Sequence, residues 1–256
     1  MIRRNAGGRV VALVSGKGGV GKSTLALALA DVWAAALKPG TVALLDFDPQ
    51  GGATVAAGVP AAADPLRAQA IAAHGFQLYP GGRALAGADE DALAHRLELA
   101  RMGAALVVVD LSPALTDGPH AVTLPLADPL VIVARCDAAG LPNVAEAVAL
   151  ATAAGCPWAI VPTMQKRTAL SREAEAFLRG RYGGRVTRTT IPEDAKAAEA
   201  AGAGRPVTAT APRAKVSAAM RALVAELDAR AACPVSGAAC PDSGHDDAAS
   251  PREAIA

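Results

Sequence analysis

The chain reads Ser15-Gly16-Lys17-Gly18-Gly19-Val20-Gly21-Lys22-Ser23-Thr24 near its amino terminus, and these ten residues are its most informative feature. A glycine, four further residues and then Gly-Lys-Ser form the pattern of a phosphate-binding P-loop. An apolar run at 10–14 precedes the loop and predicts a buried strand, while the run 25–37 after it predicts a helix. A chance glycine-rich turn is the alternative, but the strand before and the helix after favour a nucleotide site.

The residue types in the loop suit a polyphosphate. Glycines let backbone N–H groups turn inward on phosphate oxygens. Lys22 supplies a point charge to the outer phosphates, and the Ser23 hydroxyl can ligate Mg²⁺. We therefore expect nucleotide contacts from Gly18, Gly19, Val20, Gly21, Lys22, Ser23 and Thr24.

Carboxylates follow two further apolar runs. The run 41–45 leads into Asp46 and Asp48, and the run 105–109 ends at Asp110. Carboxyl ends of strands lie at the edge where doubly wound sheets bind ligands. A lone hydrophobic run followed by Asp is a weak signal, but the phosphate loop and these two runs, in this order, predict one shared site.

These pieces together resemble the ParA/MinD ATPases. Lys17, which a simple phosphate loop does not need, resembles the signature lysine of their deviant Walker A sequence, and Asp46-Phe47-Asp48-Pro49-Gln50-Gly51 resembles the ParA switch. The resemblance implies that Lys17 reaches the partner subunit's nucleotide and that Asp48 orients the attacking water. It also implies that Asp110, in the Walker B position, holds the water shell of Mg²⁺ beside Ser23, with Asp46 as an indirect partner of the metal.

The resemblance extends over about residues 9–230. The runs 128–133 and 159–164 are similar to the family's next strands, and Ile191-Pro192-Glu193-Asp194 is similar to its Ile-Pro element, followed by a short helix. It implies a base pocket at Thr163, Pro192 and Asp194. Ser112-Pro113, Gly52, Thr210-Ala211-Pro212 and the short segment between Gly51 and Leu106 depart from the family pattern and leave the cargo open.

The family implies a complete functional cycle. Its fold is an α/β doubly wound, mostly parallel sheet with helices on both faces, and its cofactors are ATP and Mg²⁺. ParA relatives form a homodimer with ATP, bind DNA without sequence preference, and hydrolyse ATP slowly until a ParB-like or cargo-adaptor protein stimulates them. The resemblance thus predicts a cytoplasmic, nucleoid-associated ATPase that segregates or positions a plasmid, chromosome or protein complex.

The charge distribution adds a candidate DNA surface. The net charge of the 256 residues is only +1, but the segment 166–230 holds 13 Lys and Arg against 7 Asp and Glu. Within it, Arg213, Lys215 and Arg221 are the first candidates for phosphate contacts, with residues 213, 217 and 221 expected on one face of a helix. Ordinary solvated helix charges are the alternative for each of them.

The apolar runs and the Gly- and Pro-rich turns between them predict how the chain is organised. Residues 1–8 are expected to be a flexible leader, 9–230 one ATPase domain, and 231–256, rich in Ser, Gly, Pro and Asp, a disordered tail. Strands are predicted near 10–14, 41–45, 105–109, 130–134, 158–162 and 185–191. Helices are predicted over 22–37, 89–102, 141–154, 168–180 and 213–230.

The sequence lacks the signatures of other classes of protein. No run approaches the roughly 20 apolar residues of a membrane span, and the tail carries four acids against Arg252, unlike the cationic amphipathic tail of a MinD-type membrane regulator. Cys233 and Cys240, with His245 nearby, fit no compact metal site, and no Cys-x-x-Cys pair indicates a metal-cluster ATPase. A nucleotide-switched regulator that does not act on DNA remains the alternative.

Overall fold

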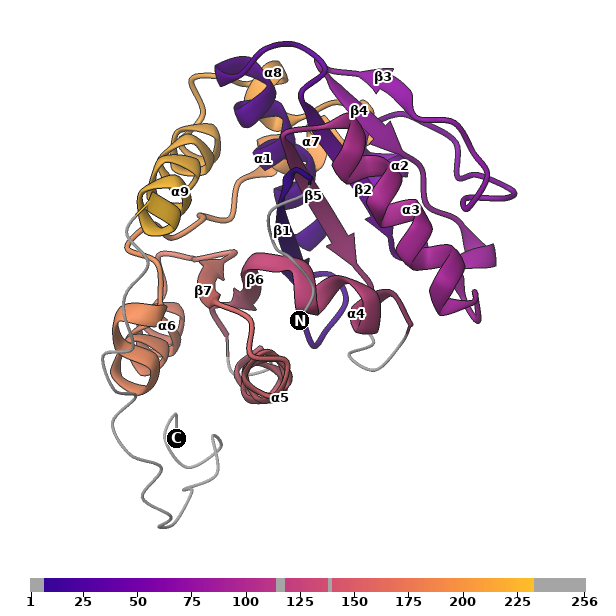
Figure 1. The fold of residues 1–256 in the computed structure, drawn as a ribbon. Helices are drawn as coiled ribbons and strands as arrows, with labels where there is room; N and C mark the ends of the chain where they lie inside the picture. The colour runs from indigo at the N-terminus through magenta and orange to yellow at the C-terminus, as the bar shows by residue number, and fades with distance from the viewer. Residues whose placement is uncertain (1–6, 114–117, 138–139, 233–256) are drawn as a thin grey trace.

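The computed structural model describes residues 7–113, 118–137 and 140–232. A seven-stranded sheet runs through it in the order β3-β4-β2-β5-β1-β6-β7, with β3 antiparallel to β4 and all other neighbours parallel (Figure 1). The strands are β1 Arg9–Val14, β2 Val42–Phe47, β3 Ile71–Ala73, β4 Phe76–Tyr79, β5 Leu106–Leu111, β6 Ala127–Arg135 and β7 Trp158–Thr163.

Helices cover both faces of this sheet (Figure 1). On one face lie α1 Lys22–Ala36, α2 Gly52–Ala56, α7 Ala195–Gly202, α8 Val207–Thr210 and α9 Lys215–Ala232. On the other lie α3 Glu90–Gly103, α4 Gly118–Thr123, α5 Leu141–Ala153 and α6 Ala169–Tyr182. The predicted fold, a doubly wound and mostly parallel sheet, is confirmed.

Continuous apolar runs form the central strands because both of their faces are covered. In β1, Val11 and Leu13 pack into the core under α1 and α9, whereas Val10, Ala12 and Val14 pack into the core under α3 and α5. Successive strand side chains point to opposite faces, so a strand with a helical layer on each side needs apolar residues throughout.

The prediction of a strand at 185–191 is wrong. A 3-10 turn, Gly183–Arg185, stands there with single bridges from Ile160 to Val186 and from Gln165 to Pro192. Side chains take the backbone groups that a ladder would use, because Arg179 donates to the carbonyl of Thr187 and Glu226 accepts the N–H groups of the next two residues. The hairpin of β3 and β4 was not predicted, since β3 has only three residues.

The predicted chain ends fall partly outside the described residues. Gly8, at the end of the expected leader, is buried and donates its N–H to the Arg101 carbonyl at 2.9 Å. Most of the expected tail, with Cys233, Cys240 and His245, lies outside the described part of the chain. Among the residues that the structure describes, no helix is long and apolar enough to cross a membrane. The same residues contain no group of three or more His, Cys, Asp or Glu side chains placed to hold a metal ion.

Candidate nucleotide site

The predicted phosphate loop lies between β1 and α1 at the carboxyl edge of the sheet. Gly19 and Gly21 have φ angles of 75° and 86°, which side chains other than glycine rarely adopt. A Cβ at Gly18 or Gly19 would meet nothing within 4 Å, so this part of the loop is open to a ligand. The first N–H groups of α1 have no partners within the helix and, with its dipole, favour an anion at the loop.

A buried lysine and two carboxylates meet beneath the loop. The Lys22 ammonium donates to Asp110 Oδ1 at 2.6 Å and lies 3.8 Å from Asp48 Oδ2. Lys22 is 6% exposed and Asp110 is fully buried. These residues come from α1, from β5 and from the loop after β2, so the fold joins three sequence motifs that lie up to 88 positions apart.

Asp46 supports this cluster from the neighbouring strand, where it lies in register with Asp110. Its Oδ2 accepts hydrogen bonds from the Thr54 N–H and hydroxyl at 2.8 and 2.6 Å, and its Oδ1 accepts from the Asp48 N–H at 3.1 Å. Burial and the Asp110 carboxylate raise the pKa of Asp46 from 3.8 to about 7, although these hydrogen bonds act in the opposite direction. Asp46 therefore fixes Asp48 and α2 in place.

Thr54 is a site residue that the sequence reading missed. Its hydroxyl donates to Asp46 and accepts the Gly81 N–H at 2.8 Å, which ties α2 to the end of β4. A Cβ on Gly81 would fall 2.8 Å from the Asp46 carboxyl carbon, so the chain passes close to this carboxylate only as glycine. A hydroxyl eight positions after a strand-end Asp is too weak a pattern to reveal this role.

One acceptor in the cluster has no partner. Asp110 Oδ2 is buried and accepts no hydrogen bond from the described residues. A buried carboxylate oxygen without a donor is costly unless a cation or a metal-bound water satisfies it. Ser23 follows Lys22 at the start of α1, and a Cβ on Gly52 would fall 2.6 Å from its hydroxyl oxygen. The departure from the family pattern at Gly52 thus keeps space beside Ser23, and the donor set fits Mg²⁺, which takes few protein oxygens.

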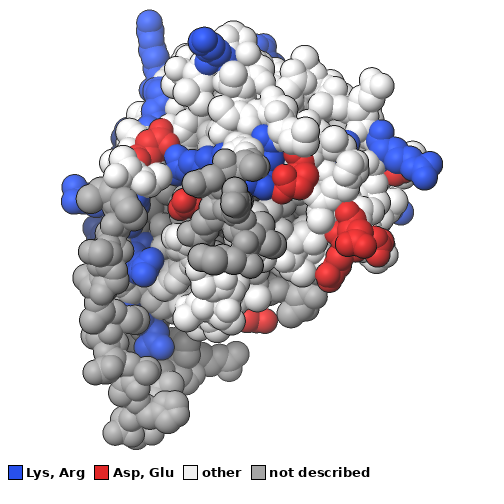
Figure 2. Space-filling view, in the orientation of Figure 1, with Lys and Arg blue, Asp and Glu red and all other residues white. Residues whose placement is uncertain are grey.

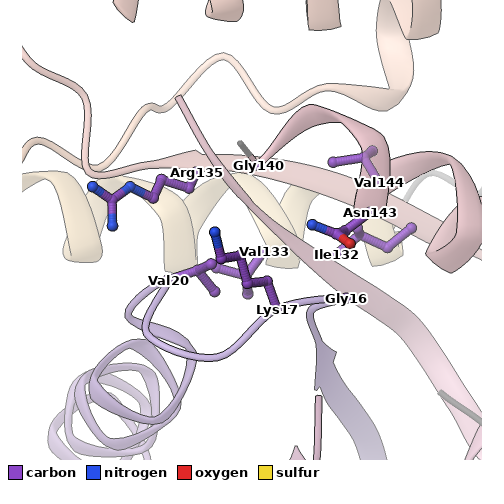
Figure 3. A pocket seen from close by; sticks show the side chains of 9 residues that line it. All are labelled: Gly16, Lys17, Val20, Ile132, Val133, Arg135, Gly140, Asn143 and Val144. Carbon is purple, nitrogen blue, oxygen red and sulfur yellow. The ribbon is translucent and has the colours of Figure 1, made fainter. Parts of the chain in front are cut away.

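Lys17 has the opposite environment from Lys22. It is exposed, and within the described residues its ammonium makes no ion pair or hydrogen bond. Figure 3 shows its stem over the loop, beside a small cavity lined also by Arg135 and by Asn143 of α5. A Cβ on Gly16 would fall 2.5 Å from Asn143 Cβ, so the loop is packed tightly against α5 on this side.

A cleft of about 530 Å³ opens on the other side of the loop and contains the predicted base-pocket residues. Thr163, Pro192 and Asp194 all line it. The Thr163 hydroxyl donates to the Val20 carbonyl at 3.1 Å and the Asp194 carboxylate caps α7, so both side chains also have structural roles. The apolar wall was not predicted, and it includes Met164, Ile191, Val216 and Met220.

The candidate DNA residues lie at the start of α9. Arg213, Lys215 and Arg221 are all exposed, and Arg221 donates to the Pro212 carbonyl at 2.6 Å, close to Arg213 in sequence. Two details of the prediction are wrong. α9 begins at Lys215, so Arg213 lies in the preceding turn, and Ser217 is fully buried with its hydroxyl on two backbone carbonyls.

Comparison with known proteins identifies the family. Residues 11–207 match the model of the CobQ/CobB/MinD/ParA nucleotide binding domain. The chromosome-partitioning ATPase Soj of Thermus thermophilus is 34% identical over 243 residues, covering 87% of this chain and 96% of Soj.

Solved structures share the fold at low identity. A ParA family ATPase from Chlorobium tepidum superposes with a TM-score of 0.73 at 19% identity, covering 85% of this chain and 98% of that one. Cobyrinic acid a,c-diamide synthase from Mycobacterium smegmatis, with a bound ATP analog and magnesium, gives 0.70 at 21% identity, covering 87% and 95%. The chain belongs to the CobQ/CobB/MinD/ParA family of nucleotide-binding domains, which confirms the ParA/MinD assignment made from its motifs.

Proposed function

We propose that this protein is a ParA-type positioning ATPase in the cytoplasm. It binds ATP with Mg²⁺, pairs with a second copy of itself, and in that state binds DNA without sequence preference until hydrolysis releases it. The observation that carries the proposal is the contrast between the two lysines of one loop. Lys22 is buried on Asp110, where it can serve the subunit's own nucleotide, whereas Lys17 faces outward without a partner among the described residues.

The magnesium site is assigned to Ser23 and Asp110. When bound, Mg²⁺ neutralises phosphate charge and orients the outer phosphate for displacement. The Ser23 hydroxyl would ligate the ion directly, and Asp110 Oδ2, which has no partner among the described residues, would hold a water of the metal's shell. Asp46 acts on the metal indirectly, because its own oxygens accept hydrogen bonds from Asp48 and Thr54. The magnesium-bound cobyrinic acid a,c-diamide synthase, which shares the fold, supports the choice of metal.

Asp48 is assigned to the attacking water. Its Oδ1 accepts the Gln50 N–H at 2.9 Å, which fixes the carboxylate, while Oδ2 remains at 3.8 Å from the Lys22 ammonium. A fixed carboxylate beside the phosphate-binding lysine can hold a water in line with the outer phosphorus and accept its proton. Attack by that water breaks the bond to the bridging oxygen and yields ADP and phosphate. We expect slow turnover until a ParB-like or cargo-adaptor protein stimulates it.

DNA binding is assigned to the exposed cations at the start of α9. Arg213, Lys215 and Arg221 form no ion pair with any described residue, so their charge is available to phosphates. Phosphate contacts give affinity without sequence preference. Pairing two subunits doubles the contacts on one DNA molecule, which makes binding depend on ATP. The 34% identity to Soj, described as a chromosome-partitioning ATPase, supports this assignment.

The test is binding to a labelled DNA duplex, measured by fluorescence anisotropy in ATP, in ADP and without nucleotide. We expect binding in ATP, much weaker binding in ADP, and affinity that falls steeply as salt rises. Replacing Arg213, Lys215 and Arg221 with Ala should strongly weaken retention on DNA while sedimentation still shows the ATP-dependent dimer. An ATP-bound dimer without DNA affinity at low salt would contradict the proposal and favour a nucleotide switch that does not act on DNA.

A further inference from the structure

A second basic surface follows α6, away from the candidates on α9. The chain reads Arg181-Tyr182-Gly183-Gly184-Arg185-Val186-Thr187-Arg188, and its three arginines are all exposed. None of the three forms an ion pair with a described residue. In Figure 2, Lys and Arg side chains appear over α6 at the left of the molecule. The proposed nucleotide cycle makes no use of this surface.

Aromatic rings hold two of these arginines in place. The Arg185 guanidinium lies 4.9 Å from the centre of the Trp158 ring, and the Arg181 guanidinium lies 5.8 Å from that of Tyr182. The two rings pack edge to face with centroids 6.2 Å apart. A guanidinium stacked on a ring still presents its edge N–H groups and loses less side-chain freedom when it binds an anion. The rings therefore prepare the arginines for phosphate.

Two acids beside this surface are already neutralised. Glu175 pairs with Arg179 at 2.7 Å, and Glu226 pairs with Arg230 at 2.9 Å. Glu226 also accepts the backbone N–H groups of Arg188 and of the residue after it, which lowers its pKa despite the opposing effect of partial burial. These contacts fix the segment to α6 and α9 and leave the charge of the exposed arginines uncompensated.

The surface lies at the amino end of β7, whereas the nucleotide site lies at the carboxyl ends of the strands. Trp158 begins β7, and Thr163 ends it against the phosphate loop, where its hydroxyl donates to the Val20 carbonyl. A strand of six residues spans about 17–20 Å. Contact at this surface therefore does not require the nucleotide.

We propose that Arg181, Arg185 and Arg188 form a second contact surface for the phosphate backbone of duplex DNA. The proposal rests on the DNA binding proposed above and adds that each subunit carries affinity independent of its nucleotide, which pairing then doubles. Three arginines on a fixed segment suit the regularly spaced phosphates of a duplex. The segment 181–188 itself exposes no large apolar side chain, and the two exposed on α6, Leu170 and Phe177, lie before it in the chain, so charge is what this segment presents to a partner.

The test is the salt dependence of duplex binding by wild type and by an R181A/R185A/R188A variant. Each lost phosphate contact should lower the slope of log affinity against log salt by about 0.9, and so by about 2.7 for each subunit. The variant should bind at least about tenfold more weakly in ATP and lose the residual binding of the nucleotide-free protein. ATP binding and ATP-dependent dimerisation should be unchanged, which shows that the variant folds.

Two further variants separate a specific surface from bulk charge. K38A/R67A/R83A removes the same charge from exposed sites on other parts of the molecule and should keep the wild-type slope. Gly184→Glu leaves every arginine in place but adds an acid where a Cβ meets nothing within 4 Å, and it should weaken binding in both nucleotide states.

The outcomes distinguish this inference from the proposed function. A wild-type slope for R181A/R185A/R188A, or an equal loss for K38A/R67A/R83A, would overturn the second surface while DNA binding through α9 stands. Retention on anionic phosphatidylserine vesicles, in place of DNA, would overturn it as well. A wild-type dimer that binds no DNA would instead remove the proposed function itself.

Discussion

Replacing Lys22 with Ala should damage both the folded state and nucleotide binding. The ammonium lies 2.6 Å from a fully buried Asp110 oxygen, and breaking such a pair leaves an uncompensated charge inside the protein. The cost for a buried pair is about 3–5 kcal/mol of unfolding free energy. Loss of a charge-assisted phosphate contact should weaken ATP binding by about 1.5–3 kcal/mol, which raises the dissociation constant for ATP roughly 10- to 150-fold.

Lys17→Ala is the matched control within the same loop. Its side chain is exposed and makes no ion pair among the described residues, so the unfolding free energy should change by less than about 0.5 kcal/mol. Monomer affinity for ATP should remain appreciable, while ATP-driven dimerisation should be lost. Urea unfolding followed by circular dichroism gives the stabilities, titration of a fluorescent ATP analogue gives monomer affinities, and sedimentation gives the dimer.

The two lysines should therefore behave differently in these assays. Equal loss of monomer affinity in both variants would refute the role of Lys17 across the dimer. A Lys22→Ala protein with wild-type urea stability would refute the claim that this ammonium compensates the buried Asp110. Lys22→Met, which keeps most of the apolar stem, should lose the same affinity and so shows that the charge matters.

Three further perturbations test the remaining roles. Asp48→Ala should bind ATP and accumulate as a dimer with little phosphate release, and a wild-type hydrolysis rate would move the water-positioning role elsewhere. The pKa of Asp46 is higher in the folded than in the unfolded state, so its contribution to the unfolding free energy is full at acidic pH and is lost as pH rises from 3.8 to about 7. Asp46→Asn should flatten this decline of the unfolding free energy in urea unfolding. Thr54→Val removes a hydroxyl that bonds Asp46 and the Gly81 N–H, and should cost about 1–3 kcal/mol and slow turnover, whereas unchanged values would show that α2 is held otherwise.

The phosphate loop was predictable because its chemistry is local. The positive φ angles at Gly19 and Gly21 and the start of α1 at Lys22 all follow from consecutive residues. Apolar runs ending in Asp46 and Asp110 also predicted their meeting, since strands buried on both faces bring their carboxyl ends to one edge.

The remaining features depend on side chains that meet across the fold. Thr54 became a site residue only because β4 ends beside α2, and nothing in its sequence neighbourhood indicates this. The strand expected at 185–191 does not form because the side chains of Arg179 and Glu226, from two different helices, bind its backbone groups. Likewise, the apolar wall of the cleft joins Met164 to Met220 of α9, a pairing that only tertiary structure reveals.

Phosphate release from ATP in the presence of duplex DNA measures directly whether this protein is an ATPase. We expect wild type to convert bound ATP to ADP and phosphate, and Lys22→Ala and Asp48→Ala to release almost none under the same conditions. Release by wild type no faster than by Asp48→Ala, with ATP demonstrably bound to both, would contradict the ATPase function and would make this protein a nucleotide-switched binding module instead.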